Sequence, residues 1–177
     1  MKTCSKITAI TASLALFGSG AFAEENWSMA TSWGGGPPLE TAAKGFAEMA
    51  EFLTNGEIKI EVFPGGTLGS PLKVTETVSN GVAEMGHHWG GYDWGVDKTT
   101  VLFGGWTGGL NAEEMQHWIY EGGGLQTWMD YRMEKFGVVA FPCGQYPREV
   151  GLHSTKKVKS LADFDGLKQR TAGAWAE

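Results

Sequence analysis

The chain has 177 residues, of which 14 are Lys or Arg and 20 are Asp or Glu, so its formal net charge is −6. Apolar residues make up 42% and aromatic residues 12%, which excludes a disordered chain, because such chains lack apolar surface to bury. The acidic balance disfavours a nucleic-acid-binding protein, since phosphate contacts require clustered Lys and Arg. The 27 glycines and 8 tryptophans together favour a folded binding protein, with tight turns beside large aromatic surfaces.

The first 23 residues have the pattern of a cleavable signal peptide. Lys2 and Lys6 form a basic start, an apolar stretch runs from Ile7 to Phe17, and Ala21-Phe22-Ala23 supplies a small-x-small cleavage site. The apolar stretch is shorter than the about 20 residues that a membrane-spanning helix needs. We therefore expect residues 1–23 to be removed on export rather than retained as a helix.

Cysteine usage excludes a disulfide within the mature chain. Cys4 lies in the expected leader, which leaves Cys143 without a cysteine partner. Because Cys143 ends an apolar run that starts at Val138, we expect a buried small side chain rather than a nucleophile. A packed core must then stabilise the fold.

Strands and helices alternate along the first part of the mature chain. Strands are expected at Trp27–Ser32, at Ile58–Val62 and within Val82–His88. Between the first two, Pro38 suits the first turn of a helix, and Asn55-Gly56 is a typical left-handed stop. The apolar stripe expected on this helix consists of Ala42, Phe46, Met49, Ala50 and Leu53. A second helix is expected to begin at Ser70-Pro71 and to end near Asn80-Gly81.

Two further helices and three short strands are expected after a glycine-rich region, which we interpret as loop with a short helix or strand (90–109). Asn111 followed by Glu114 forms a capping box, and Gly122-Gly123-Gly124 breaks the helix that begins there. The second helix runs over Leu125–Phe136, with Leu125, Trp128, Met129, Met133 and Phe136 as its apolar stripe, and Gly137 ends it. The strands are expected at Val138–Phe141, Val150–His153 and Leu167–Thr171.

This order predicts an α/β fold, with a mostly parallel sheet and helices on both faces. Ligands of such sheets bind beyond the carboxyl ends of the strands. Three glycine-rich aromatic turns fall at those ends, namely 33–36, 87–90 and 143–146. Such turns are either the walls of a ligand site or ordinary connections between strands and helices.

The sequence contains no recognisable catalytic or zinc-binding pattern. His87 and His88 are adjacent on an expected strand, so their side chains point to opposite faces of the sheet. No His-Glu-x-x-His motif, paired-cysteine motif, Gly-x-Ser-x-Gly motif, phosphate-binding loop or dinucleotide fingerprint is present. We therefore expect a protein that is not an enzyme.

Several segments, in this order, resemble the DctP family, the solute-binding proteins of tripartite ATP-independent periplasmic (TRAP) transporters. The similar segments are Trp27–Trp33 with Pro38-Leu39, Ile58–Gly69, Val82–His87, Leu110–Leu125, and Leu161-Ala162-Asp163 with Gly166–Thr171. The likeness is greatest to the branch that binds 2-oxo acids and related small monocarboxylates.

The resemblance implies a periplasmic-binding-protein-like receptor with two α/β lobes and a cleft between them. Residues 24–146 would form the first lobe and residues 147–177 the start of a second, truncated lobe. The receptor would reside in the periplasm, capture a small carboxylate and deliver it to TRAP permease subunits in the membrane, for uptake driven by an ion gradient.

The same resemblance implies the site residues. Arg170, in Gly-Leu-Lys-Gln-Arg-Thr, matches the arginine that grips the ligand carboxylate in this family. A guanidinium suits this role because it meets a carboxylate with two parallel hydrogen bonds; otherwise Arg170 is a surface residue paired with a nearby acid. Glu149 is the candidate ligand of a bridging Na⁺ or Ca²⁺, or else simply pairs with Arg148. The candidate walls of the site are Trp33, Tyr92 and Gln145.

Two other functions remain open. The eight tryptophans beside glycine turns suit a secreted carbohydrate-binding module, in which indole rings stack on sugars. A small exported hydrolase is the third hypothesis, although Cys143, His88 and Glu149 share no known catalytic spacing.

Overall fold

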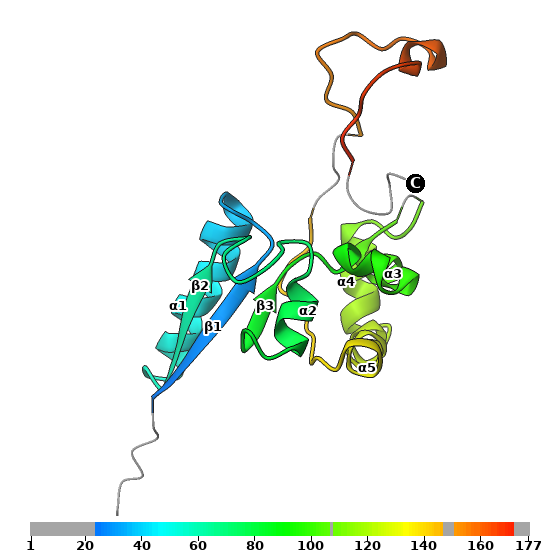
Figure 1. Cartoon of the computed structure of the whole chain (residues 1–177). Coiled ribbons are helices and arrows are strands. Elements are labelled where there is room, and N and C mark those ends of the chain that lie inside the picture. Colours follow the sequence, from blue (N-terminus) through cyan, green and yellow to red (C-terminus); the bar gives the residue numbers. More distant parts are fainter. Residues whose placement is uncertain (1–23, 107, 147–150, 172–177) are drawn as a thin grey trace, which may run out of the picture.

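A computed structural model describes residues 24–106, 108–146 and 151–171 of the chain. The expected signal peptide therefore lies outside the described residues, as does the start of the expected second lobe at residues 147–150. Figure 1 shows the strands and the first helices on one side and the α3–α5 group on the other, with residues 151–171 projecting away from both. The elements are β1 (Glu25–Thr31), η1 (Pro38–Ala43), α1 (Lys44–Leu53), β2 (Ile58–Phe63), α2 (Val74–Ser79), β3 (Met85–His87), η2 (Gly90–Gly95), η3 (Lys98–Thr100), α3 (Val101–Gly104), α4 (Ala112–Tyr120), α5 (Gly124–Phe136) and η4 (Leu161–Phe164).

The three strands form a parallel sheet with β1 in the centre, in the order β2-β1-β3. Met29 of β1 is in register with Val62 of β2 on one side and with Met85 of β3 on the other. The crossover through α1 runs outward from β1 to β2, and the crossover through α2 runs back from β2 past β1 to β3, in the opposite direction. Because such crossovers are right-handed, the two helices cover opposite faces of the sheet. The α/β class, the parallel sheet and the helices on both faces are confirmed.

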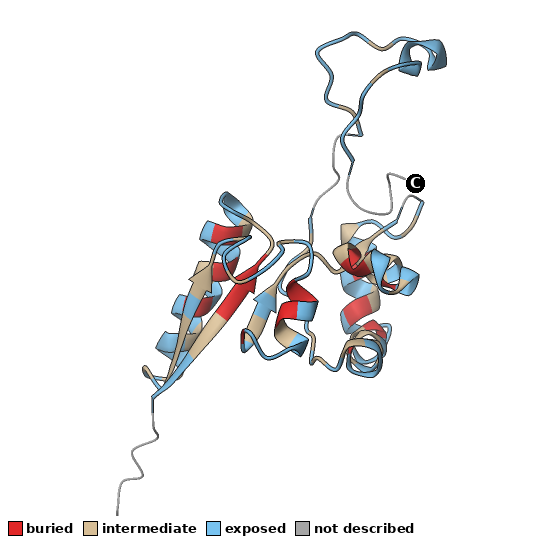
Figure 2. Ribbon diagram, in the orientation of Figure 1, coloured by how far each residue is buried: buried red, intermediate tan, exposed pale blue. Residues whose placement is uncertain are grey.

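The packed core lies between β1 and α2 and is small. Ala30 of β1, Val74 of α2 and Ala83 before β3 form a buried cluster, against which Leu68 packs. Gly86 of β3 faces this cluster, and a Cβ there would lie 2.5 Å from Val74 Cγ1. Figure 2 shows buried residues gathered on β1, on α2 and inside the α3–α5 group.

Most of the expected helix ends are confirmed. Asn111 accepts hydrogen bonds from the N–H groups of Glu113 and Glu114 at 3.0 Å, and the Glu114 carboxylate accepts one from the Asn111 N–H at 2.8 Å. This capping box satisfies N–H groups that a helix start otherwise leaves unpaired. α5 ends at Gly137, whose φ of 67° lies in the left-handed region that favours glycine.

The apolar stripe expected on the first helix was wrong by about one position. The buried residues of η1 and α1 are Leu39, Ala43 and Ala47, whereas Met49 is 56% and Leu53 is 73% exposed. These three residues recur every four positions, so they share one face of the helical segment, and that face is the buried one.

The three strands expected in the C-terminal part were also wrong for the residues that the structure describes. Residues 138–141, 151–153 and 167–171 belong to no strand or helix, and Phe141 is 53% exposed. A strand requires a hydrogen-bonded neighbour, and the sheet β2-β1-β3 does not extend to these segments. Cys143, expected to be buried, is exposed for the same reason.

Among residues 24–106, 108–146 and 151–171, no helix is long and apolar enough to cross a membrane.

Candidate functional site

The candidate site lies at the carboxyl ends of β1 and β3. The connection that leaves β1 runs toward β2, whereas β3 lies on the other side of β1, and open α/β sheets bind ligands at such positions. The Ser32 N–H donates to the His87 carbonyl oxygen at 3.1 Å. The Trp33 and His87 rings lie 4.8 Å apart between centroids. The structure thus brings together the aromatic turns at 33–36 and 87–90 that the sequence singled out.

The turn after β2 fixes the backbone of Trp33. The Gly65 N–H donates to the Trp33 carbonyl oxygen at 2.8 Å, and the Thr31 hydroxyl donates to the Phe63 carbonyl oxygen at 2.9 Å. A Cβ at position 65 would lie 2.8 Å from the Ser32 carbonyl carbon, so this close approach requires glycine. Three glycine-rich or aromatic turns therefore converge at one edge of the sheet.

Two buried polar atoms at this edge have no hydrogen-bond partner among the described residues. They are Ser32 Oγ and His87 Nδ1. Burial lowers the pKa of His87 below its usual value, which favours the neutral ring at neutral pH. The Ser32 hydroxyl and the neutral His87 ring can each form a hydrogen bond with a polar ligand or with water.

The segment η2 carries Tyr92 beside this edge. The Trp89 indole N–H donates to the Gly104 carbonyl oxygen at 2.7 Å. The half-buried Tyr92 ring stands edge-on to Trp89, with centroids 5.2 Å apart and planes at 89°. Trp89 is thus fixed through its nitrogen and orients Tyr92 through its ring.

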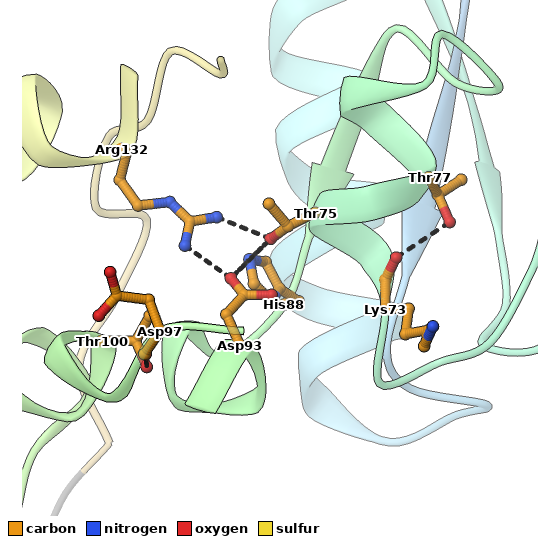
Figure 3. Close-up of polar contacts among 8 residues, drawn as sticks. All are labelled: Lys73, Thr75, Thr77, His88, Asp93, Asp97, Thr100 and Arg132. Carbon is orange, nitrogen blue, oxygen red and sulfur yellow. Dashed lines mark hydrogen bonds and ion pairs between the residues drawn. The ribbon is translucent and has the colours of Figure 1, made fainter. Parts of the chain in front are cut away.

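Behind η2 lies a buried cluster of four polar side chains, defined here as the Arg132 cluster: Thr75, His88, Asp93 and Arg132 (Figure 3). Arg132 Nη1 donates to Asp93 Oδ2 at 2.6 Å, and Arg132 Nη2 donates to Thr75 Oγ1 at 2.7 Å. The Thr75 hydroxyl donates to Asp93 Oδ2 at 2.7 Å. His88 Nε2 lies 3.1 Å from Thr75 Oγ1. The cluster therefore joins α2, the end of β3, η2 and α5.

The hydrogen-bond geometry assigns a tautomer to His88. Thr75 has one hydroxyl proton, and Asp93 accepts it. His88 must then donate from Nε2 to Thr75. Burial is the main cause that lowers the pKa of His88 to about 4, with Asp93 opposing the shift and Arg132 adding to it. His88 is therefore neutral at physiological pH.

The Arg132 cluster was missed by sequence reasoning. Its signal was present, because Arg132 lies four residues after Trp128 and four before Phe136, which places it on the expected apolar stripe of α5. The Arg132 guanidinium carbon lies 4.3 Å from the Phe136 ring centroid. A charged residue on an apolar stripe indicates a buried partner, although nothing in the sequence identified Asp93.

The other residues proposed from the sequence are not joined to this edge by hydrogen bonds within the described residues. Gln145 is half-buried in the irregular segment after α5, and Arg170 is exposed and follows no strand. A hollow of about 420 Å³ is lined by residues 153–156 and 166–168. Arg170 is not among the residues that line it. Glu149 lies outside the described residues.

Within the described residues, no group of three or more His, Cys, Asp or Glu side chains could hold a metal ion.

Comparisons with known proteins identify the class of protein. The profile of the family described as bacterial extracellular solute-binding protein, family 7 (DctP) matches residues 29–177. A monocarboxylate 2-oxoacid-binding periplasmic protein of Nostoc sp. is 36% identical over 151 residues, which cover 83% of this chain and 40% of that protein.

Two solved structures of TRAP transporter solute-binding proteins are similar in fold. The protein from Bordetella bronchiseptica, with calcium and picolinate bound, is 32% identical, with a TM-score of 0.77, and the match covers 86% of this chain and 45% of that one. The protein from Pseudoalteromonas atlantica, with sodium and pyruvate bound, is 28% identical, with a TM-score of 0.63, and the match covers 67% and 36%.

The fold and the comparisons define an extracellular solute-binding protein. The chain belongs to the DctP family of bacterial extracellular solute-binding proteins, and the two similar solved structures are solute-binding proteins of TRAP transporters. It spans less than half the length of the relatives described above.

Proposed function

We propose that this chain is part of a periplasmic receptor that captures a small organic acid, a 2-oxo acid or a related monocarboxylate. The observation that carries the proposal is the match of residues 29–177 to the DctP family, together with 36% identity to a 2-oxoacid-binding relative. The edge formed by Ser32, Trp33 and His87 supports it, because it lies where parallel sheets bind ligands.

Arg170 is proposed to hold the ligand carboxylate. A guanidinium binds a carboxylate through two parallel charge-assisted hydrogen bonds, and the positive charge offsets the hydration that the anion loses. Arg170 is exposed in the described residues, so its guanidinium is accessible to a carboxylate ligand from solution. Trp33, Tyr92 and Gln145 are proposed as walls of the site.

A cation is proposed to bridge the ligand to the protein. The Bordetella and Pseudoalteromonas proteins contain calcium and sodium, respectively, together with a carboxylate ligand. Na⁺ and Ca²⁺ prefer oxygen ligands, so the Glu149 carboxylate is the candidate donor from this chain.

Export to the periplasm through residues 1–23 and delivery of the acid to TRAP permease subunits complete the proposal. Both belong to the function of the class, since a solute-binding protein must meet its ligand outside the cytoplasm and release it to a transporter.

The proposal can be tested by isothermal titration calorimetry of the purified chain with pyruvate, in calcium, in sodium and in a buffer without either ion. We expect saturable pyruvate binding that strengthens when one of the cations is present. Neutral mono- and disaccharides serve as controls. Saturable sugar binding without pyruvate binding would favour a carbohydrate-binding module instead, and no pyruvate binding in any buffer would contradict the proposal.

A further inference from the structure

Arg132 connects α5 to parts of the chain that are distant in sequence. Its side chain is 4% exposed, and it donates to Asp93, 39 residues earlier, and to Thr75, 57 residues earlier. Asp93 is equally buried, with a side chain 5% exposed. Because hydrogen bonds to charged partners are strong in a buried setting, these contacts fix α5 against α2 and η2.

The segment η2 has little support of its own. Gly90, Gly91 and Gly95 lie within its six residues, and a 3₁₀ helix has poorer hydrogen-bond geometry than an α-helix. Two of the contacts that hold η2 in place involve its own residues Gly91 and Asp93. One is the packing of Gly91 against Trp89, so close that a Cβ at Gly91 would lie within 2.4–2.7 Å of the indole. The other is the Asp93 carboxylate in the Arg132 cluster.

Two residues of the Arg132 cluster directly follow residues of the candidate site in the sequence. Asp93 follows Tyr92, and His88 follows His87, whose ring contacts Trp33. Figure 3 shows the guanidinium of Arg132 pointing toward both Thr75 and Asp93, with His88 next to them. A displacement of Asp93 or His88 would therefore move Tyr92 or His87.

We propose that Arg132, acting through Asp93 and Thr75, is a positioning residue that holds η2 and the carboxyl end of β3 in the geometry of the ligand site. The role as a ligand site rests on the proposed function, whereas the positioning of the backbone does not. Removal of one member of a buried ion pair leaves an uncompensated charge, while replacement of both is much milder.

Hydrogen exchange measured by mass spectrometry on the full chain tests the positioning. The variants are Arg132→Met, Asp93→Asn and the double variant, with Lys135→Met as the matched control, because Lys135 lies on the same helix in an exposed ion pair with Glu134. We expect each single variant to accelerate exchange in residues 87–95 by about tenfold or more, with β1 and β2 unchanged. The double variant is expected to exchange more slowly in residues 87–95 than either single variant.

A uniform acceleration over the whole chain would overturn the proposal, because it would show a general loss of stability. Unchanged exchange in residues 87–95 would overturn it too. If a single variant does not fold, the double variant, which leaves no buried charge, gives the same comparison with the wild type.

Pyruvate titration by calorimetry separates the two proposals. We expect Arg132→Met to weaken pyruvate binding by about tenfold and Lys135→Met to leave it unchanged. If the wild-type chain binds no pyruvate, the proposed function fails, and the exchange result still decides whether Arg132 positions residues 87–95. Pyruvate binding unchanged in Arg132→Met would overturn the link to the ligand site.

Discussion

Arg132 Nη1 lies 2.6 Å from Asp93 Oδ2, and both side chains are almost fully buried. This ion pair joins α5 to η2, the segment that follows β3 (Figure 3). The contribution of this ion pair to stability depends on whether both charges are fully hydrogen-bonded, because a buried charge is tolerated when it is paired and hydrogen-bonded. Thr75 provides the additional hydrogen bonds that complete the pair.

His88 is expected to make stability depend on pH. Burial lowers the pKa of His88 to about 4 in the folded chain from 6.5 in the unfolded chain. Between these values the unfolded chain binds a proton that the folded chain does not, so stability falls as the pH is lowered from about 6.5 to about 4. The loss attributable to His88 is up to about 3 kcal/mol.

Urea unfolding at a series of pH values measures this effect. His88→Gln removes the titrating ring, so the free energy of unfolding should change less steeply with pH between pH 4 and 6.5. His117→Gln, at an exposed histidine, is the control variant. An identical slope in His88→Gln and the wild type would contradict the expectation. The lowered pKa of His87 leaves a residual slope of the same sign.

Asn111→Ala is expected to destabilise the chain by about 1 kcal/mol. The substitution removes the side-chain oxygen that accepts from the N–H groups of Glu113 and Glu114 at the start of α4. Chemical denaturation measures the change, and Gln116→Ala, at an exposed position of the same helix, is the control. A smaller loss for Asn111→Ala than for the control would show that the cap does not stabilise α4.

Two glycine-to-alanine substitutions should change stability in opposite directions. Gly65→Ala places a Cβ 2.8 Å from the Ser32 carbonyl carbon, so we expect a loss of about 1–3 kcal/mol. Gly45 lies in α1 with open space around its Cα, so Gly45→Ala should stabilise by about 0.5–1 kcal/mol. Thermal unfolding followed by circular dichroism distinguishes the two. If Gly65→Ala left the stability unchanged, the turn after β2 would have shifted to accommodate the added Cβ, contrary to the expectation.

Arg170→Ala is expected to weaken pyruvate binding by several kcal/mol while leaving the melting temperature nearly unchanged. The substitution removes the proposed partner of the ligand carboxylate, and the exposed position of Arg170 limits any effect on folding. Lys168→Ala, two residues away and also exposed, is the control for loss of positive charge. Equal affinity in Arg170→Ala and the wild type, measured by calorimetry, would remove Arg170 from the site.

Local signals in the sequence were sufficient for much of the fold. The strand at Ile58–Val62, the capping box at Asn111 and the stop at Gly137 each depend on residues close in the chain, and each is confirmed. The position of the aromatic turns at 33–36 and 87–90 also followed, because parallel strands bring their carboxyl ends to one edge.

The sequence by itself determined the α/β class, the order of β1 to β3 with the helices between them, and the meeting of the turns at 33–36 and 87–90 at one edge of the sheet. Only the tertiary structure decided which face of α1 is buried, whether residues 138–141 pair as a strand, and which acid neutralises Arg132. The physical reason is the range of the interactions. Caps and periodicity act within a few residues, whereas strand pairing and buried ion pairs need partners that only folding brings together.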